Sequence, residues 1–242
     1  MTEEGALRLY GVGVGPGDPE LLTLKALRVL QEAVHIFVAS SSKNDYSLAL
    51  RVVEGYLPAG VPVERLSFPM TRERARLEEA WEKNARRVAE VLREKGSAVF
   101  LTLGDPALFS TFGHLARAVR ERVPEVEIEM VPGITAAQAA AARLGVILAE
   151  GEGAFLIASA LAAEGVLRKL LRETSSLALY KVYRRTPEIL RLLEEEGRLS
   201  ETRAVSLCGL PEEKVYQDPR DLSHSRPPYF TLLLVGGKSL TE

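Results

Sequence analysis

Three glycine-containing turns are the first features of this sequence that could hold a ligand. The first is Gly11-Val12-Gly13-Val14-Gly15-Pro16-Gly17-Asp18-Pro19, the second is Leu103-Gly104-Asp105-Pro106, and the third is Val131-Pro132-Gly133-Ile134-Thr135. Glycine has no Cβ, so we expect these turns to let a ligand approach the backbone closely. Each turn follows an apolar, strand-like segment, and open α/β sheets bind ligands where their strands end. The pattern therefore predicts a small-molecule site built from turns.

The glycine spacing of the first turn argues against a nicotinamide dinucleotide. That fingerprint needs G-x-G-x-x-G, but its last position is Pro16 when counted from Gly11 and Asp18 when counted from Gly13. A plain strand-to-helix turn, with Asp18 capping the helix that follows, is the alternative for this segment. Thr135 has a similar alternative as the N-cap of the next helix.

The elements that must position these turns alternate between strands and helices. We expect strands at residues 8–14, 34–39, 98–103, 127–131, 154–158, 176–180, 203–208 and 229–235. We expect helices at residues 21–30, 73–95, 115–122 and 135–144, with Gly96 ending the second. Alternation of this kind is typical of parallel α/β domains. The Pro-marked break at Val123-Pro124-Glu125 predicts two of them, an N-terminal α/β domain over 1–123 and a C-terminal α/β domain over 124–242.

Composition excludes several classes of protein. A net charge of −2 over 242 residues provides no field to attract a nucleic acid. Cys208 is the only cysteine, so no intrachain disulfide can form, and the three histidines lack metal-ligand spacing. The first residues are acidic, unlike a signal peptide, and no apolar run approaches the roughly 20 residues of a membrane helix. We expect a cytoplasmic protein without a metal, a nucleic-acid partner or a membrane span.

Taken together, the three turns resemble those of the tetrapyrrole methylase family of S-adenosylmethionine-dependent enzymes. The shared segments are G-x-G-P-G-D-P-E-L-L-T-L-K-A from Gly13 onward, G-D-P at 104–106 and V-P-G-I-T at 131–135. The resemblance covers nearly the whole chain. It implies two α/β domains with the cofactor in a cleft between them, a tetrapyrrole substrate and a homodimer.

Further segments resemble those family members that methylate C20, a meso carbon, of precorrin-2 or of its cobalt complex. These segments are residues 104–112, 140–151, 180–184, 208–213 and 229–235. Other enzymes stay open as alternatives: a tetrapyrrole methylase acting on uroporphyrinogen III or on a later corrin carbon, or a methyltransferase acting on diphthamide or ribosomal RNA. A module that binds a nucleoside without catalysis is the alternative from a different class.

The resemblance also implies which residues contact S-adenosylmethionine and its product, S-adenosylhomocysteine. By motif position these contacts, mostly through the backbone, fall on Pro16, Leu103, Gly104, Asp105, Leu108, Thr135, Ala136, Lys181 and Gly209. Gly15 is placed on the substrate side of the same turn. Lys181 departs from the family pattern, because relatives often have Met there.

The implied reaction is an in-line displacement, in which an electron-rich carbon of the substrate attacks the sulfonium methyl group. Catalysis then depends mainly on holding the two carbon atoms roughly 3 to 3.5 Å apart. Asp105 is the candidate general base, although Asp before Pro also commonly begins a turn. The substrate's carboxylates favour arginine partners, because guanidinium groups bind carboxylates in a bidentate manner. The candidates are Arg72, Arg74, Arg184 and Arg185.

Overall fold

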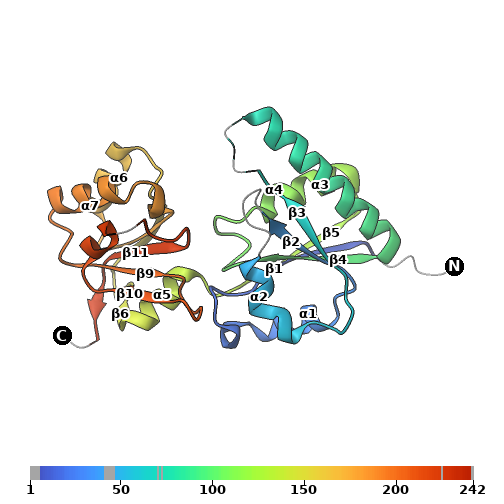
Figure 1. Ribbon diagram of the computed structural model, residues 1–242, viewed down its shortest axis with the longest axis horizontal. Coiled ribbons are helices and arrows are strands. Elements are labelled where there is room, and N and C mark those ends of the chain that lie inside the picture. The colour runs from blue at the N-terminus through green and yellow to red at the C-terminus, as the bar shows by residue number, and fades with distance from the viewer. Residues whose placement is uncertain (1–5, 41–46, 70, 72, 225, 241–242) are drawn as a thin grey trace. The chain divides into compact units, whose positions relative to one another are not determined.

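The computed structural model describes residues 6–40, 47–69, 71, 73–224 and 226–240, and it divides into two compact units (Figure 1). The units are Met1–Thr135 and Ala136–Glu242. The predicted boundary after residue 123 therefore falls too early. Strand β5 (Glu127–Val131) pairs in parallel with β1 (Arg8–Gly13), so it belongs to the sheet of the first unit. The break at Pro124 is a turn inside that unit.

The first unit is built on a five-stranded sheet with the strand order β3-β2-β4-β1-β5, and all of its pairings are parallel. Its other strands are β2 (Ile36–Ser40), β3 (Val63–Ser67) and β4 (Ser97–Thr102). Its helices are α1 (Leu24–Gln31), α2 (Leu48–Val53), α3 (Arg74–Lys95) and α4 (Phe112–Arg122), with short 3-10 turns η1 (Pro19–Leu21) and η2 (Glu54–Tyr56). The long helix and its end at Gly96 agree with the sequence prediction.

Helices cover both faces of this sheet because side chains alternate along each strand. Leu9, Phe37 and Phe100 are buried on the face that α3 and α4 cover. Val12 and Leu101 are buried on the opposite face, under α1 and α2 (Figure 1). A parallel sheet covered in this way leaves the carboxyl ends of its strands together at one edge.

The second unit has a mixed sheet with the strand order β10-β9-β11-β8-β7. Its strands are β7 (Phe155–Ser159), β8 (Ser176–Tyr180), β9 (Thr202–Ser206), β10 (Lys214–Tyr216) and β11 (Thr231–Gly236). Only β7 and β8 pair in parallel, because β11 runs antiparallel to β8 and β9, and β10 antiparallel to β9. The second unit is therefore an α/β domain with a mixed sheet, whereas the sheet of the first unit is all parallel.

Helices α6 (Glu164–Glu173) and α7 (Thr186–Glu195) share one apolar core with this sheet, and α5 (Ala136–Leu144) packs against β11. The remaining elements are the 3-10 turns η3 (Val182–Arg184) and η4 (Pro219–Ser223) and a ribbon of β6 (Val146–Ile147) with β12 (Lys238–Ser239). Among the described residues of either unit, no helix has the length and hydropathy needed to cross a lipid bilayer.

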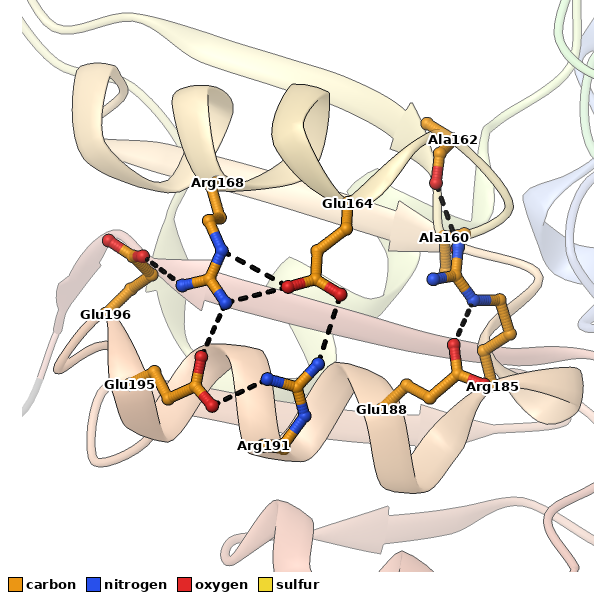
Figure 2. Close-up of polar contacts among 9 residues, drawn as sticks. All are labelled: Ala160, Ala162, Glu164, Arg168, Arg185, Glu188, Arg191, Glu195 and Glu196. Carbon is orange, nitrogen blue, oxygen red and sulfur yellow. Dashed lines mark hydrogen bonds and ion pairs between the residues drawn. The ribbon is translucent and has the colours of Figure 1, made fainter.

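Charged side chains join α6 to α7 on the surface of the second unit (Figure 2). The guanidinium of Arg168 donates to the carboxylates of Glu164 and Glu195, and also to Glu196 at 2.7 Å. Arg191 donates to Glu164 at 3.1 Å and to Glu195 at 2.6 Å. The hydrogen bonds from Arg168 are the main cause of the lowered pKa values of Glu164 and Glu195. The network therefore stabilises the ionised carboxylates and holds the two helices in register.

Candidate active site

The three glycine-containing turns of the sequence lie side by side at the carboxyl edge of the first unit's sheet. Strand β1 lies between β4 and β5, so the segments that follow these three strands leave the sheet together. Gly15 and Gly104 form a β-bridge across two of the turns. The amide of Gly104 donates to the carbonyl of Gly15 at 2.7 Å, and the amide of Gly15 donates back at 3.3 Å. Turns that are distant in the sequence thus form one rigid surface.

Asp105 connects the second turn to the third. One carboxylate oxygen accepts from the amide of Ala107 at 2.8 Å, and the other accepts from the amide of Gly133 at 3.0 Å. Hydrogen bonds to a charged acceptor are stronger than neutral ones, so this carboxylate positions both turns. A role for Asp105 as general base stays a prediction beside this observed role.

The glycines of the first turn make room for the protein itself. A Cβ on Gly13 would lie 2.6 Å from the carbonyl oxygen of Gly104 and 2.7 Å from the amide nitrogen of Gly133. A Cβ on Gly11 would lie 2.3 Å from the ring of Phe112. The expectation that these two glycines clear space for a ligand is therefore wrong. Gly104 differs, since a Cβ built there meets no atom of the described residues within 4 Å, and its φ of +75° favours glycine.

Backbone strain marks the predicted cofactor positions in both units. Non-glycine residues with positive φ cost roughly 1 to 3 kcal/mol and gather at functional sites. Within the described residues they are Phe109 at +53°, Lys181 at +63° and Leu207 at +53°. Phe109 follows the predicted contact Leu108, Lys181 is itself a predicted contact, and Leu207 lies two residues before Gly209. None of the three carries a sequence signal for this conformation.

The segments around Lys181 and Gly209 lie at the same end of the second sheet. They follow β8 and β9, and β11 begins between them because it runs antiparallel to both. The amide of Gly209 donates to the carboxylate of Glu213 at 2.8 Å, and Arg143 pairs with the same carboxylate at 2.6 Å. A cofactor contact at Gly209 would therefore use its carbonyl or its Cα.

Cys208, beside this turn, behaves as a packed thiol. It is buried, and burial raises its pKa to about 12. A thiol of this kind stays protonated near neutral pH and is a poor nucleophile.

Comparison with known proteins identifies the fold and the family. Residues 8–222 match the family of tetrapyrrole (corrin/porphyrin) methylases. This chain belongs to that family. Its resemblance to the family, predicted from the three turns, is confirmed.

Two relatives match this methylase over nearly its whole length, and a third matches 60% of it. The cobalt-precorrin-2 C(20)-methyltransferase of Salmonella typhimurium is 36% identical over 94% of this chain and 95% of its own. The precorrin-2 C(20)-methyltransferase of Sinorhizobium sp. is 31% identical over 98% of both chains. A probable cobalt-precorrin-2 C(20)-methyltransferase of Methanocaldococcus jannaschii is 44% identical over 60% of each chain.

A solved structure supports the two α/β domains of this methylase. The uroporphyrin-III C-methyl transferase from Thermus thermophilus, complexed with S-adenyl homocysteine, superposes with a TM-score of 0.68. It is 26% identical and covers 95% of this chain and 97% of its own. The cofactor predicted from the sequence agrees with the ligand of that structure.

The predicted cofactor positions of the methylase fit a ligand held mainly by the backbone. Pro16 and Gly15 are buried, whereas the other positions are partly exposed: Leu103, Gly104, Asp105, Leu108, Thr135, Ala136, Lys181 and Gly209. Both backbone groups of Gly104 bond to Gly15, so a ligand would meet Gly104 at the open face of its Cα. Rigid turns that include a glycine with an uncovered Cα, here Gly104, suit a cofactor that contains a nucleoside.

Arg74, one of the four predicted substrate arginines, is the first residue of α3. Arg74 pairs with Glu78 at 2.7 Å, one helical turn away, and its side chain is 91% exposed. An exposed pair of this kind contributes little and is easily exchanged for another partner. Arg72 lies outside the described residues.

The other two predicted arginines, adjacent in sequence, have different surroundings. Arg185 donates to the carbonyls of Ala160 and Ala162 at 3.1 and 2.8 Å, which ties the segment after β7 to α7 (Figure 2). These bonds occupy the guanidinium and disfavour its predicted role toward substrate. Arg184 is exposed, and its guanidinium carbon lies 5.4 Å from the centre of the Tyr183 ring.

Thr23 is a positioning residue that sequence reasoning missed. Its hydroxyl accepts from the amide of Ala26, which caps α1, and donates to the carbonyl of Pro132 at 3.4 Å. It thereby connects the start of α1 to the third turn. The predicted cap, Asp18, instead caps η1 by accepting from Glu20 at 2.9 Å. A threonine just before an apolar helical pattern was the available signal.

Proposed function

We propose that this methylase transfers a methyl group from S-adenosylmethionine to C20 of precorrin-2 or cobalt-precorrin-2, a step of corrin biosynthesis. The observation that carries the proposal is full-length similarity to C20-methyltransferases from Salmonella typhimurium and Sinorhizobium sp.. The joined turns after β1, β4 and β5 add support, because they form a rigid surface at the edge where α/β sheets bind ligands.

The cofactor, when bound, supplies an electrophilic sulfonium methyl group. We assign its contacts to Pro16, Leu103, Gly104, Asp105, Leu108, Thr135, Ala136, Lys181 and Gly209. The task of these residues is to fix position, since an effectively intramolecular geometry supplies much of the rate. The hydrogen bonds of Asp105 to Ala107 and Gly133 suit this task, because they hold the second and third turns together. On the substrate side we place Gly15 and Arg184.

The decisive experiment traces the methyl group. The purified protein is incubated anaerobically with methyl-labelled S-adenosylmethionine and with precorrin-2 or cobalt-precorrin-2, and the product is examined by NMR. We expect label at C20. Uroporphyrinogen III serves as the competing substrate, because the Thermus thermophilus relative is named for uroporphyrin-III methylation. Label at any other carbon, or transfer only to uroporphyrinogen III, would overturn the proposal.

We further propose that the enzyme works as a cytoplasmic homodimer. Strand β7 is an edge of the second sheet, and it carries Leu156 and Ile157, which are 37% and 36% exposed. An exposed apolar edge is a template for pairing with another chain. Light scattering should give twice the mass of one chain, and Leu156→Lys should lower it. A monomeric wild-type protein at micromolar concentration would contradict this assignment.

A further inference from the structure

Three aromatic side chains form a continuous cluster at one end of the second sheet, where β8 ends and β11 begins. The ring centres of Tyr183 and Tyr229 are 4.8 Å apart, and those of Tyr229 and Phe230 are also 4.8 Å apart. Tyr229 is 43% exposed and Phe230 is 42% exposed. We call these three residues the aromatic surface. Single exposed apolar residues are ordinary, but a packed group of rings at a sheet edge is a feature that binding sites use.

The backbone beneath the aromatic surface is held firmly. The hydroxyl of Thr231 donates to the carbonyl of Pro228 at 2.8 Å and lies 2.7 Å from the hydroxyl of the buried Ser206. The amide of Leu207 donates to the carbonyl of Phe230 at 2.8 Å. A surface that is ordered before binding loses little conformational entropy when a ligand arrives.

These bonds also place the aromatic surface beside predicted cofactor positions. The residue that bonds Phe230 is Leu207, two residues before Gly209, and Tyr183 is two residues after Lys181. Lys181 and Leu207 both have positive φ. The strained backbone and the exposed rings thus belong to the same edge of this one unit.

Arg184 gives the aromatic surface a positive charge, and no carboxylate of the described residues pairs with it. Most arginines of the second unit donate to a carboxylate or a backbone carbonyl. They are Arg143, Arg168, Arg172, Arg185, Arg191, Arg198, Arg203 and Arg220. Among the described residues of that unit, Arg184 and Arg226 alone have no such partner. Arg184 instead lies over the ring of Tyr183.

We propose that the aromatic surface and Arg184 receive the tetrapyrrole macrocycle. This inference rests on the proposed function. Tyr183, Tyr229 and Phe230 contact the broad ring system through their faces and edges, as aromatic groups do with one another. Arg184 binds one of the carboxylate side chains at the rim, where its planar guanidinium gives a bidentate fit.

The test separates macrocycle binding from cofactor binding. Tyr229→Leu, Phe230→Leu and Arg184→Gln are titrated with S-adenosylhomocysteine by calorimetry and with uroporphyrin III, a stable polycarboxylate tetrapyrrole, by absorbance. We expect the Kd for S-adenosylhomocysteine to stay within about twofold, and the Kd for uroporphyrin III and the KM for precorrin-2 to rise about tenfold, which is about 1.4 kcal/mol. Added salt should weaken uroporphyrin III binding less in Arg184→Gln than in the wild type.

Matched controls lie in the first unit. Tyr56→Leu removes another exposed tyrosine, in η2 before the amino end of β3, and Arg120→Gln removes an exposed arginine of α4. Neither should change the affinity for either ligand. Arg184→Gln alters only an exposed side chain, so it carries the test even where an aromatic variant fails to fold.

The outcomes distinguish this inference from the proposed function. If the folded variants kept the wild-type affinity for uroporphyrin III and the wild-type KM, the proposed binding role of the aromatic surface would be overturned. This result would hold whichever carbon the enzyme methylates. A wild-type protein that methylates neither precorrin would overturn the proposed substrate, while loss of uroporphyrin III affinity in the variants would still support the surface.

Discussion

Replacing Gly133 with alanine tests whether backbone contact between the turns builds the cofactor site. The new Cβ would lie 2.2 Å from the carbonyl oxygen of Gly104 and 2.8 Å from the carbonyl carbon of Gly13. Ordinary contact begins at 3.4 Å, so the turns must separate by about 1 Å. Overpacking of this kind costs about 1 to 3 kcal/mol. Loss of the hydrogen bond from Gly133 to Asp105 would add about 1 kcal/mol.

The displacement should affect ligand binding as well as stability. A shift of about 1 Å in groups that position a substrate can cost about a hundredfold in rate. We expect Gly133→Ala to lower the free energy of unfolding, measured in urea, by the sum of two costs. These are about 1 to 3 kcal/mol for overpacking and about 1 kcal/mol for the lost hydrogen bond. Its affinity for S-adenosylhomocysteine should fall about tenfold, measured by calorimetry.

Gly113→Ala is the matched control for this substitution. Gly113 lies in α4, and a Cβ there meets its nearest atom, in the Arg117 side chain, at 3.7 Å. Alanine should therefore stabilise the helix by roughly 0.5 to 1 kcal/mol and leave ligand affinity unchanged. If Gly133→Ala matched the wild type in both measurements, the contact between the three turns would not be what forms the site.

Three further predictions concern single side chains. In Asp105→Asn, one of the two backbone amides must face an NH2 group. We therefore expect the free energy of unfolding to fall by about 1 to 3 kcal/mol and S-adenosylhomocysteine to bind more weakly. Intact binding with lost turnover would instead support a role for Asp105 as general base. The pKa values of Glu164 and Glu195 are lowered in the fold, so their contribution to stability is complete above the ordinary value of 4.5 and is lost as the pH falls through the lowered values. The difference in Tm between wild type and Arg168→Gln should therefore shrink from pH 7 toward pH values below 4.5, and a difference that does not vary with pH would contradict the network. Cys208, buried and with its pKa raised to about 12, should resist a thiol reagent at pH 8 and react after unfolding in urea, so rapid labelling of the native protein would refute its packed environment.

Local sequence signals determined much of the first unit. The apolar runs at 8–14 and 98–103 predicted β1 and β4. The pattern at 73–95 predicted α3, and Gly96 predicted its end, where the structure has a φ of +78°. These signals succeed because strand burial, helical periodicity and a glycine cap act over a few neighbouring residues. The order of the three turns was also sufficient to indicate the family.

Contacts between distant segments decided what the sequence left open or misplaced. The pairing of β5 with β1 moved the unit boundary from Val123 to Thr135, because a Pro-marked break does not reveal which sheet the next strand joins. The arginine pair is a second case. Arg184 and Arg185 are identical in type and adjacent in sequence, yet only Arg185 reaches the carbonyls of Ala160 and Ala162.

The glycines show the same division between sequence and structure. The sequence by itself determined that the turn at Gly11 to Pro19 must lack side chains at several positions, and that its spacing does not suit a dinucleotide. Only the tertiary structure decided what fills the space: the ring of Phe112 beside Gly11, and the backbones of Gly104 and Gly133 beside Gly13. A missing Cβ is encoded locally, whereas the atom that takes its place comes from another part of the chain.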